Sequence, residues 1–458
     1  MQVPKMAPES EEDDVYVGYN EWAADGLGIT LCTDFVYDVD EDGERGVFIA
    51  EDIAPQTQVL SIPLGSLLTT LWVEQQHEDA VYARVLSWVE AQESSPEDGV
   101  DVEDDVLATT LLYERFIARD KSKWWRHLQL LPTTYHNALY FTDKEVEMLQ
   151  GSTVCYIAQQ MKTNVDAGFA RLKQTLFADI ADAVVTHHPE RSIEQVEACF
   201  SLENYKWALS TIWSRFVSLQ IASATFRKAM APVFDMLNHD PDAEMSHHFD
   251  TETQTFQLTS YQHWSAGSQL CINYGALSNH KLLTLYGFVL PENPFDAVEM
   301  WLPMDPSSTS EFETKVKLLE EIDVDHEVTP FELTVDELDE LLLIVMRIQV
   351  LECESSETFQ ESAQRITNGD SANTENELTA LSRLVVIMQQ TIQSYAVPSD
   401  DPTSKECDGV LHKTPNGVHS LHEHMAQVVR QSDLAILNAS IEMLKWRLLD
   451  VLPNRQSA

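Results

Sequence analysis

Paired cysteines are absent from this chain. Its six cysteines occur singly, with no C-x-x-C spacing, at Cys32, Cys155, Cys199, Cys271, Cys353 and Cys407. This pattern excludes the usual structural zinc sites and provides no disulfide framework. We therefore expect a protein of a reducing compartment.

Long apolar runs are also absent. No run approaches the ~18 residues that a membrane span needs, and the longest are short, such as residues 341–346. The N-terminus has no apolar signal segment and carries Glu9, Glu11, Glu12, Asp13 and Asp14, whereas a transit peptide is poor in acids. We expect no membrane association and no export, hence a location in the cytoplasm, with the nucleus as a second compartment.

Basic residues are scarce. The chain has 29 Lys and Arg against 75 Asp and Glu, which gives a net charge of −46. Such a surface repels phosphate backbones, and the sequence has no basic patch, so nucleic-acid binding is not expected. The charge would attract a basic partner such as a lysine-bearing protein, although composition by itself favours plain solubility as its explanation.

The apolar content indicates a folded protein of more than one domain. Hydrophobic residues make up 44% of the 458, with ten tryptophans, and this length allows two or three cores. Residues 1–18 are acidic and expected to be disordered. Short apolar runs at 47–53 and 59–63 predict strands. Residues 72–90 predict helix, residues 91–105 an acidic loop, and the segment after 107 further helices to about residue 200.

The second half of the chain changes from mixed to helical patterns. We expect a helix over residues 205–219 and a hairpin over 245–259 with its turn at 250–253. After Pro303, Thr334-x-x-Glu337 and Thr374-x-x-Glu377 read as capping boxes. Apolar residues in 3–4 spacing over 378–395 and 434–448 predict long helices, and the polar loop 398–409 separates them. The C-terminal part is therefore expected to be all-helical.

Three polar and aromatic clusters lie between residues 205 and 294. The first is residues 213–216, Trp-Ser-Arg-Phe. The second, residues 233–240, is an apolar run that ends in an amide, an imidazole and a carboxylate. Buried groups of this kind are costly unless they are hydrogen-bonded, so they form either a satisfied local network or the wall of a polar pocket.

The third cluster contains two tyrosines twelve residues apart, Tyr274 and Tyr286, each followed by glycine. A glycine beside an aromatic residue lets the backbone turn sharply or approach closely, which can aim a phenol into a cleft. Two core tyrosines with helix-capping glycines explain the same pattern equally well.

Taken together, Ser214-Arg215, Asp235-x-x-Asn238-His239, Tyr274-Gly275 and Tyr286-Gly287-Phe288 closely resemble the SET-domain methyltransferases. Within these, the chain is similar to the branch of the Rubisco large-subunit lysine methyltransferase. The resemblance implies an α+β fold: short β-sheets with a pseudoknot around Tyr286 and a helical insertion at about 72–204, followed by an all-α domain. It implies a SET domain over 19–300 and a helical substrate-binding domain over 301–458.

The resemblance also implies the site for one cofactor, S-adenosyl-L-methionine. Arg215 would contact its carboxylate, and Asn238 and His239 would meet its adenine and amino-acid ends. The N-terminal motif that holds the cofactor falls on Glu44, Arg45 and Gly46. Two residues rather than one separate Gly43 from Gly46, and the pair Gly26 and Gly28 competes for this role.

Substrate-side roles follow from the same resemblance. Tyr286 would be the catalytic phenol, Tyr274 and Phe288 would line the lysine channel, and Asp235 would be a structural partner of the loop. A metal site is not expected, because the histidines at 239, 247 and 248 lack an i, i+4 pair.

The expected function is methylation of a lysine nitrogen in a non-histone protein by a monomeric enzyme. The absence of the cysteine-rich zinc flanks found in many histone-directed SET enzymes favours a non-histone substrate. Two alternatives stay open: a protein-histidine methyltransferase of the same fold, and a non-catalytic binding adaptor. All polar residues that the mechanism needs are present, which counts against the adaptor.

Overall fold

The computed structural model describes residues 15–39, 45–94, 101–222, 225–307, 309–352, 356–395, 411–414 and 417–452. Glu44, the first fourteen residues and the loop 398–409 lie outside the described residues. The chain forms two compact units. The first comprises residues up to Tyr135 together with Met161–Ala276, and the second comprises His136–Gln160 and the chain from Leu277 onward.

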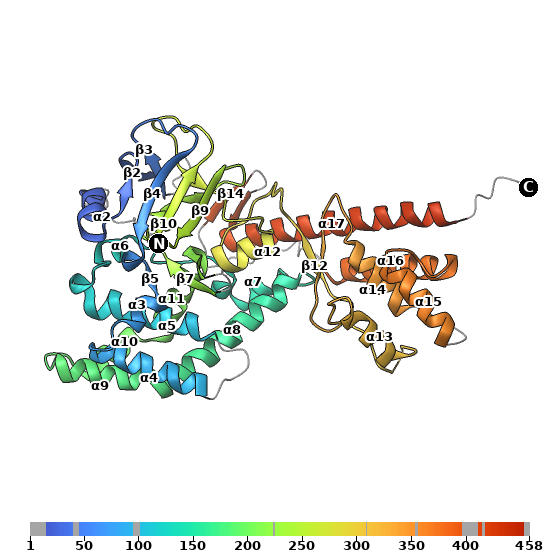
Figure 1. Cartoon of the computed structure of the whole chain (residues 1–458), viewed down its shortest axis with the longest axis horizontal. Helices are drawn as coiled ribbons and strands as arrows, with labels where there is room; N and C mark the ends of the chain where they lie inside the picture. Colours follow the sequence, from blue (N-terminus) through green and yellow to red (C-terminus); the bar gives the residue numbers. More distant parts are fainter. Residues whose placement is uncertain are drawn as a thin grey trace, which may run out of the picture. The chain divides into compact units, whose positions relative to one another are not determined.

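The first unit is built on small antiparallel sheets (Figure 1). Strand β4 (Thr57–Pro63) lies between β1 (Thr30–Leu31) and β10 (Thr255–Ser260), and β9 (Met245–Asp250) continues the sheet. Strands β9 and β10 confirm the predicted hairpin. The alternating side chains Leu60 and Ile62 of β4 and Phe256 and Leu258 of β10 are buried, which explains why these runs form strands.

Two further sheets complete the antiparallel part of this unit. Strand β2 (Phe35–Val39) pairs with β3 (Arg45–Ile49). Strand β7 (Thr225–Met230) lies between β5 (Leu68–Thr69) and β6 (Phe216–Ala222). The predicted helix over 205–219 is therefore wrong in its last turn: α11 (Leu202–Arg215) ends at Arg215. Pairing with β7 and the alternating burial of Val217 and Leu219 favour a strand from Phe216 onward.

A short parallel pair joins two of the sequence clusters. Asn238–His239 (β8) pairs with Cys271–Ile272 (β11), with Asn238 opposite Cys271 and His239 opposite Ile272. This register places the polar end of the second cluster beside the start of the third. The predicted threading of the segment around Tyr286 involves residues of both units and stays a prediction.

The insertion after β5 is helical, as predicted, and most of its helices belong to the first unit. Its elements there are α3 (Thr70–Glu74), α4 (Ala80–Ser94), α5 (Val102–Leu112), η2 (Tyr113–Ala118), η3 (Arg119–Lys121), α6 (Trp125–Leu130), α9 (Ala178–His187) and α10 (Ile193–Cys199). Helix α2 (Tyr19–Leu27) precedes the strands. The elements η4 (Ala138–Tyr140), α7 (Asp143–Glu147), α8 (Thr153–Leu172) and η5 (Lys173–Phe177) lie between α6 and α9 in the sequence.

The predicted acidic loop 91–105 is wrong at both ends, because α4 continues to Ser94 and α5 begins at Val102. The Asp101 carboxylate accepts a hydrogen bond from the Asp104 N–H (3.0 Å) and so caps this helix. Asp104 and Asp105 are buried and form ion pairs with Lys228 and Arg171, respectively. Ion pairs with Lys228 and Arg171, which are distant in the sequence, thus stabilise Asp104 and Asp105 in a helix that the local sequence pattern does not predict.

The second unit is mainly helical. Its elements from Leu277 onward are α12 (Asn279–Lys281), η7 (Leu282–Tyr286), α13 (Phe312–Glu320), α14 (Glu340–Gln349), α15 (Ser356–Thr367), α16 (Thr374–Ser394) and α17 (Leu421–Val451). Helices α16 and α17 lie side by side (Figure 1) and share a core of Leu381, Leu384, Leu437 and Ile441. Among the described residues, no helix is both long and apolar enough to cross a bilayer.

The prediction of an all-α C-terminal part needs one correction. Strand β12 (Val298–Met300) pairs with β13 (Phe331–Leu333), and β14 (Leu411–Thr414) pairs with β15 (Gly417–Ser420). The segment 277–300 groups with the C-terminal helices rather than with the preceding sheets. One reason is the hydrogen bond between His280 Nε2 and Asp433 Oδ1 (2.6 Å), both buried.

Both predicted capping boxes are wrong in their details. Helix α14 starts after Asp339, and the Thr334 hydroxyl accepts from the Glu337 N–H in a turn before it. Helix α16 is capped by Asn373, one residue before Thr374. The Glu377 carboxylate instead accepts two hydrogen bonds from Arg347 (2.6 and 2.8 Å). A charged partner elsewhere in the chain outweighs the local cap.

Candidate functional site

In the first unit, Asp235 is the centre of a buried polar chain. It lies in η6 (Phe234–Met236), and its side chain is 0% exposed. His127 Nε2 lies 3.1 Å from Asp235 Oδ2, and the Tyr19 hydroxyl lies 2.8 Å from His127 Nδ1. Arg215, the last residue of α11, donates to the Asp235 carbonyl oxygen, and its Nη1 lies 3.9 Å from Oδ1. Asp235 thus contacts His127 and Arg215 directly, and Tyr19 through His127.

Arg215 carries a positive charge in a largely buried position. Burial by itself lowers the pKa of Arg215, but the oxygens of Tyr135, Asp235 and Tyr274 raise it by more, so the net pKa is raised. Among the described residues, Arg215 Nε and Asp235 Oδ1 are buried without a hydrogen-bond partner. A buried donor on a cation is costly when it is unpaired, so the site fits an anionic ligand group that would accept from Nε.

Asn238 joins β8 to the N-terminal strand β3. Its Nδ2 donates to the Arg45 carbonyl oxygen (2.8 Å) and to Gln269 Oε1 (2.9 Å). A Cβ at position 46 would lie 2.7 Å from the Gln269 side chain, so a larger residue there would push the Gln269 amide aside. The structure therefore brings Arg45, Gly46 and Asn238 together. Gln269 was missed from the sequence, because a lone glutamine before a strand carries no signal.

His239 and Tyr274 are in direct contact. The Tyr274 N–H donates to His239 Nδ1 (3.1 Å), so the neutral imidazole carries its proton on Nε2. Burial lowers the pKa of His239, which keeps the ring neutral at pH ~7. The Tyr274 hydroxyl donates to the Leu237 carbonyl oxygen (2.7 Å), and the two rings lie 5.0 Å apart. Hydrogen bonds thus join the second cluster to the third, whereas Asp235 Oδ1 of the second cluster has no partner among the described residues.

Tyr286 belongs to the second unit, at the end of η7. This π-helix ends at Gly287, whose φ is +83° and whose N–H donates to the Leu282 carbonyl oxygen (2.9 Å). A Cβ at Gly287 would lie 2.7 Å from the Asn137 nitrogen, so both conformation and space require glycine. Burial raises the pKa of Tyr286, so the phenol is protonated at neutral pH. The Phe288 ring lies 6.2 Å from the Tyr286 ring, nearly edge-on.

A histidine pair supports the backbone against which Gly287 packs. His136 Nδ1 lies 3.3 Å from His422 Nε2, and the His422 ring stacks on Phe141 with centroids 4.3 Å apart. Glu145 Oε2 lies 3.1 Å from His422 Nδ1, within ion-pair range but without the alignment of a hydrogen bond. These contacts hold the loop beside Gly287 from within the same unit. No spacing in the sequence indicates them.

The predicted site residues divide between the two units. Those that lie in the first unit are Arg45, Gly46, Arg215, Asp235, Asn238, His239 and Tyr274, and those in the second are Tyr286 and Phe288. Glu44 lies outside the described residues. No group of three His, Cys, Asp or Glu side chains in the described ranges could hold a metal ion. His247 packs against Phe234 and Phe256 instead (5.3 and 5.5 Å).

Two family models match the chain. The model described as "SET domain" matches residues 44–275, and the model described as "Rubisco LSMT substrate-binding" matches residues 306–437.

Characterised relatives include enzymes that differ in their acceptor. The ribosomal lysine N-methyltransferase set10 of Schizosaccharomyces pombe is 24% identical over 296 residues, covering 63% of this chain and 48% of the relative. The actin-histidine N-methyltransferase of Mus musculus is 27% identical over 202 residues, covering 44% of this chain and 32% of the relative. The chain thus spans about half of the first relative and about a third of the second.

A solved structure has the same fold. It is the crystal structure of the SET domain of LSMT bound to MeLysine and AdoHcy, with a TM-score of 0.72 over 98% of this chain and 94% of that one. The sequences are 18% identical, so the likeness concerns the fold. It agrees with the predicted arrangement of short sheets, helical insertion and helical C-terminal part.

Proposed function

The chain belongs to the SET-domain family, whose model matches just over half of its residues, and we propose that it transfers a methyl group from S-adenosyl-L-methionine to a nitrogen of a protein side chain. The observation that carries this proposal is the buried cation Arg215, whose Nε has no hydrogen-bond partner among the described residues. The carboxylate of the cofactor's amino-acid end would accept from it in a charge-assisted hydrogen bond.

The neighbouring residues fit the same cofactor. The Nδ2 donors of Asn238 are both used inside the protein, so Asn238 would meet the cofactor through its Oδ1 or its backbone. The contact of Asn238 with the Arg45 carbonyl oxygen supports the assignment of Arg45 and Gly46 to the same site. Asp235 would act indirectly, because it holds Arg215 and the loop that leads to β8.

Bound S-adenosyl-L-methionine supplies a methyl group on a positively charged sulfonium. The acceptor nitrogen must therefore reach the site with a free electron pair. A free lysine has a pKa of ~10.4, and its neutralisation near pH ~7 costs about 4.6 kcal/mol. An apolar channel lowers this cost, because burial and nearby positive charge both disfavour an ammonium.

In our proposal Tyr286 orients this nitrogen. Because burial raises its pKa, the Tyr286 phenol stays neutral and forms hydrogen bonds without a negative charge that would hold the amine protonated. No strong general base is then required. Phe288 would form an apolar wall of the lysine channel and Tyr274 a second lining group.

We propose lysine as the acceptor, on the strength of the lysine-directed relative and the match to the substrate-binding family model. Histidine is the second candidate, supported by the actin-histidine relative. A histidine is mostly neutral near pH ~7, so it would need little of the neutralisation that lysine needs. We further propose a monomer acting in the cytoplasm, with the helical C-terminal region binding the protein substrate.

The first experiment incubates the protein with labelled S-adenosyl-L-methionine and paired peptides that differ only in Lys or His. Label on the lysine peptide is the expected result. Label on the histidine peptide alone would show that histidine, and not lysine, is the acceptor. The same reaction on an extract of cells lacking the protein identifies the substrate band. Cofactor binding with no transfer to any extract protein would favour the binding adaptor.

Two variants test the assigned residues. Tyr286→Phe should abolish transfer while cofactor binding stays nearly unchanged; Tyr156→Phe, 65% exposed in the same unit, is the matched control. Arg215→Gln should weaken cofactor binding by roughly 10- to 150-fold, the equivalent of about 1.5–3 kcal/mol for a hydrogen bond to a charged group. The exposed Arg84→Gln controls for loss of one charge. Full activity of Tyr286→Phe would reject its role.

A further inference from the structure

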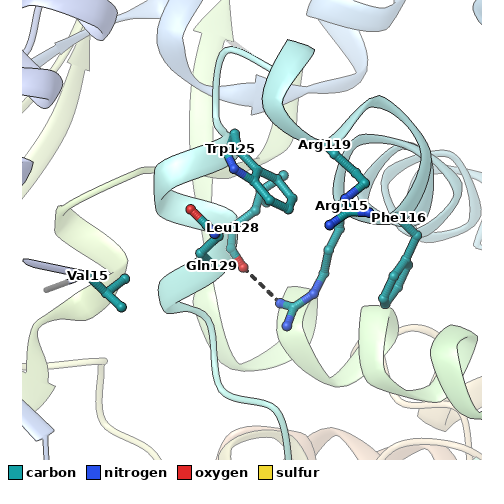
Figure 2. Close-up of a pocket in the computed structure, with 7 residues that line it drawn as sticks. All are labelled: Val15, Arg115, Phe116, Arg119, Trp125, Leu128 and Gln129. Atoms are coloured by element: carbon teal, nitrogen blue, oxygen red, sulfur yellow. Dashed lines mark hydrogen bonds between the residues drawn. The ribbon is translucent and has the colours of Figure 1, made fainter. Parts of the chain in front are cut away.

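A cavity of about 390 Å³ lies in the first unit between α6 and the segment η2–η3 (Figure 2). Helix α6 contributes Trp125, Leu128 and Gln129 to its lining, and the opposite segment contributes Arg115 and Arg119. None of the residues assigned above to the methyltransferase site lines this cavity. Its volume is in the range of small-molecule sites.

Helix geometry separates this cavity from the methyl-transfer residues. Positions 125, 128 and 129 share one face of α6, because successive residues are ~100° apart. His127, which bonds Asp235, and Leu130, whose carbonyl oxygen accepts from Arg45 (3.3 Å), lie on the other face. The cavity is therefore a second site on the same helix.

The cavity concentrates positive charge in a strongly acidic protein. The chain has 75 acidic against 29 basic residues, yet neither Arg115 nor Arg119 forms an ion pair within the described part of the chain, and no carboxylate lines the cavity. Other arginines of the same structure do pair with carboxylates: Arg171 with Asp105, Arg347 with Glu377 and Arg447 with Glu340. Two guanidinium groups that form no ion pair within the described residues leave donors for an anion.

Arg115 is held in place before any ligand arrives. Its Nη1 donates to the Leu128 carbonyl oxygen (2.9 Å), and its guanidinium lies 4.2 Å from the centroid of the Trp207 ring. This hydrogen bond uses one of its five donors. The remaining donors belong to a rigid planar group, which matches the geometry of phosphate and carboxylate oxygens.

An aromatic surface lies beside the charges. The Arg119 guanidinium is 5.7 Å from the centroid of the Trp125 ring, and Trp125 is only partly buried. Arg119 lines the cavity, and its backbone has φ +52°, a conformation that L-residues rarely adopt. Figure 2 shows Trp125 on one side of the cavity, and Arg115, Phe116 and Arg119 on the other.

From this arrangement we infer that the cavity binds a small anion attached to a planar ring. The anionic group would lie between Arg115 and Arg119, and the ring would stack on Trp125. Ring stacking on an aromatic side chain tolerates many ring types. A nucleoside monophosphate and an aromatic carboxylate share this chemistry, and binding trials with both distinguish them.

Calorimetric titration of the full chain tests the site. The probes are adenosine monophosphate, inorganic phosphate, adenosine and benzoate, each with saturating S-adenosylhomocysteine present so that the methyl-donor site is blocked. We expect submillimolar binding of adenosine monophosphate, at least tenfold tighter than of phosphate or adenosine alone. Benzoate binding tighter than adenosine monophosphate would support the same site with a carboxylate ligand.

Point variants separate a loss of ligand binding from a loss of folding. Arg119→Glu changes an exposed side chain and should weaken binding more than tenfold, and Trp125→Leu should bring adenosine monophosphate to the level of phosphate. Arg84→Gln, an exposed arginine in the same unit, should change nothing. Binding that survives Arg119→Glu, or absence of binding at millimolar ligand, overturns the inference. Thermal unfolding of each variant verifies that it is folded.

Discussion

Replacement of Asp235 by asparagine is the sharpest test of the buried polar chain in the first unit. The change keeps the size of the side chain and removes only its charge. His127 can still donate to the asparagine oxygen, but Arg215 loses the carboxylate 3.9 Å from its Nη1. The asparagine amide would face the guanidinium with like partial charge.

The size of the effect follows from burial. The Asp235 side chain is 0% exposed and that of Arg215 is 19% exposed, so water screens the pair weakly. A hydrogen bond to a charged group contributes about 1.5–3 kcal/mol, and breaking a fully buried ion pair costs about 3–5 kcal/mol. Because Arg215 keeps its bond to the Asp235 carbonyl oxygen, we expect a loss of about 3 kcal/mol.

Thermal unfolding measures this loss. For a unit of this size, about 3 kcal/mol corresponds to a Tm decrease of roughly 6–12 °C. The exposed Asp25→Asn in the same unit is the control and should stay within about 0.5 kcal/mol of the parent. Calorimetry with S-adenosylhomocysteine should also show weaker binding by Asp235→Asn, because Arg215 is no longer fixed. A Tm within 2 °C of the parent, about 0.5–1 kcal/mol, would refute this account of the network.

Three other comparisons test the second unit. Gly287→Ala and Gly369→Ala, at φ +83° and +95°, each add about 1–2 kcal/mol of backbone strain. In thermal unfolding Gly287→Ala should lose clearly more stability than Gly369→Ala, because only the Cβ at position 287 would meet backbone atoms (2.7 Å). Equal losses of stability would contradict the close packing at Gly287. Burial lowers the pKa of His280, but the Asp433 carboxylate 2.6 Å away raises it by more, so the net pKa is raised. The His280–Asp433 pair therefore stabilises the fold fully below the ordinary histidine pKa of about 6.5, and this stabilisation is lost as the pH rises through the raised pKa of His280. Over that pH range the Tm of the parent should fall relative to the Tm of His280→Gln. If the two Tm values change in parallel with pH, the pair does not contribute. Glu377→Gln should cost about 3–5 kcal/mol in urea unfolding, since it leaves a buried arginine without its carboxylate, and a loss below about 1 kcal/mol would show that the pair is not needed.

Local pattern alone was enough for several parts of the fold. Alternating apolar residues with a polar turn predicted the hairpin β9–β10, and 3–4 spacing predicted α16 and α17. These features depend on side-chain periodicity within one element, which the chain displays directly. The clusters around Arg215, Asn238 and Tyr286 likewise indicated the family, because their residue types and order are themselves the signal.

Tertiary structure alone decided which residues meet. Asn238 contacts the Arg45 carbonyl from 193 positions away, and His127 reaches Asp235 across 108. Partners at such separations leave no periodic trace, so Gln269 and His127 were missed although both contact predicted site residues. The same cause explains the local errors: strand pairing ended α11 at Arg215, and charged partners elsewhere kept residues 102–105 helical. Residue spacing indicates the secondary structure that one segment prefers by itself. Burial and charge pairing with distant residues determine where the folded protein departs from that local preference.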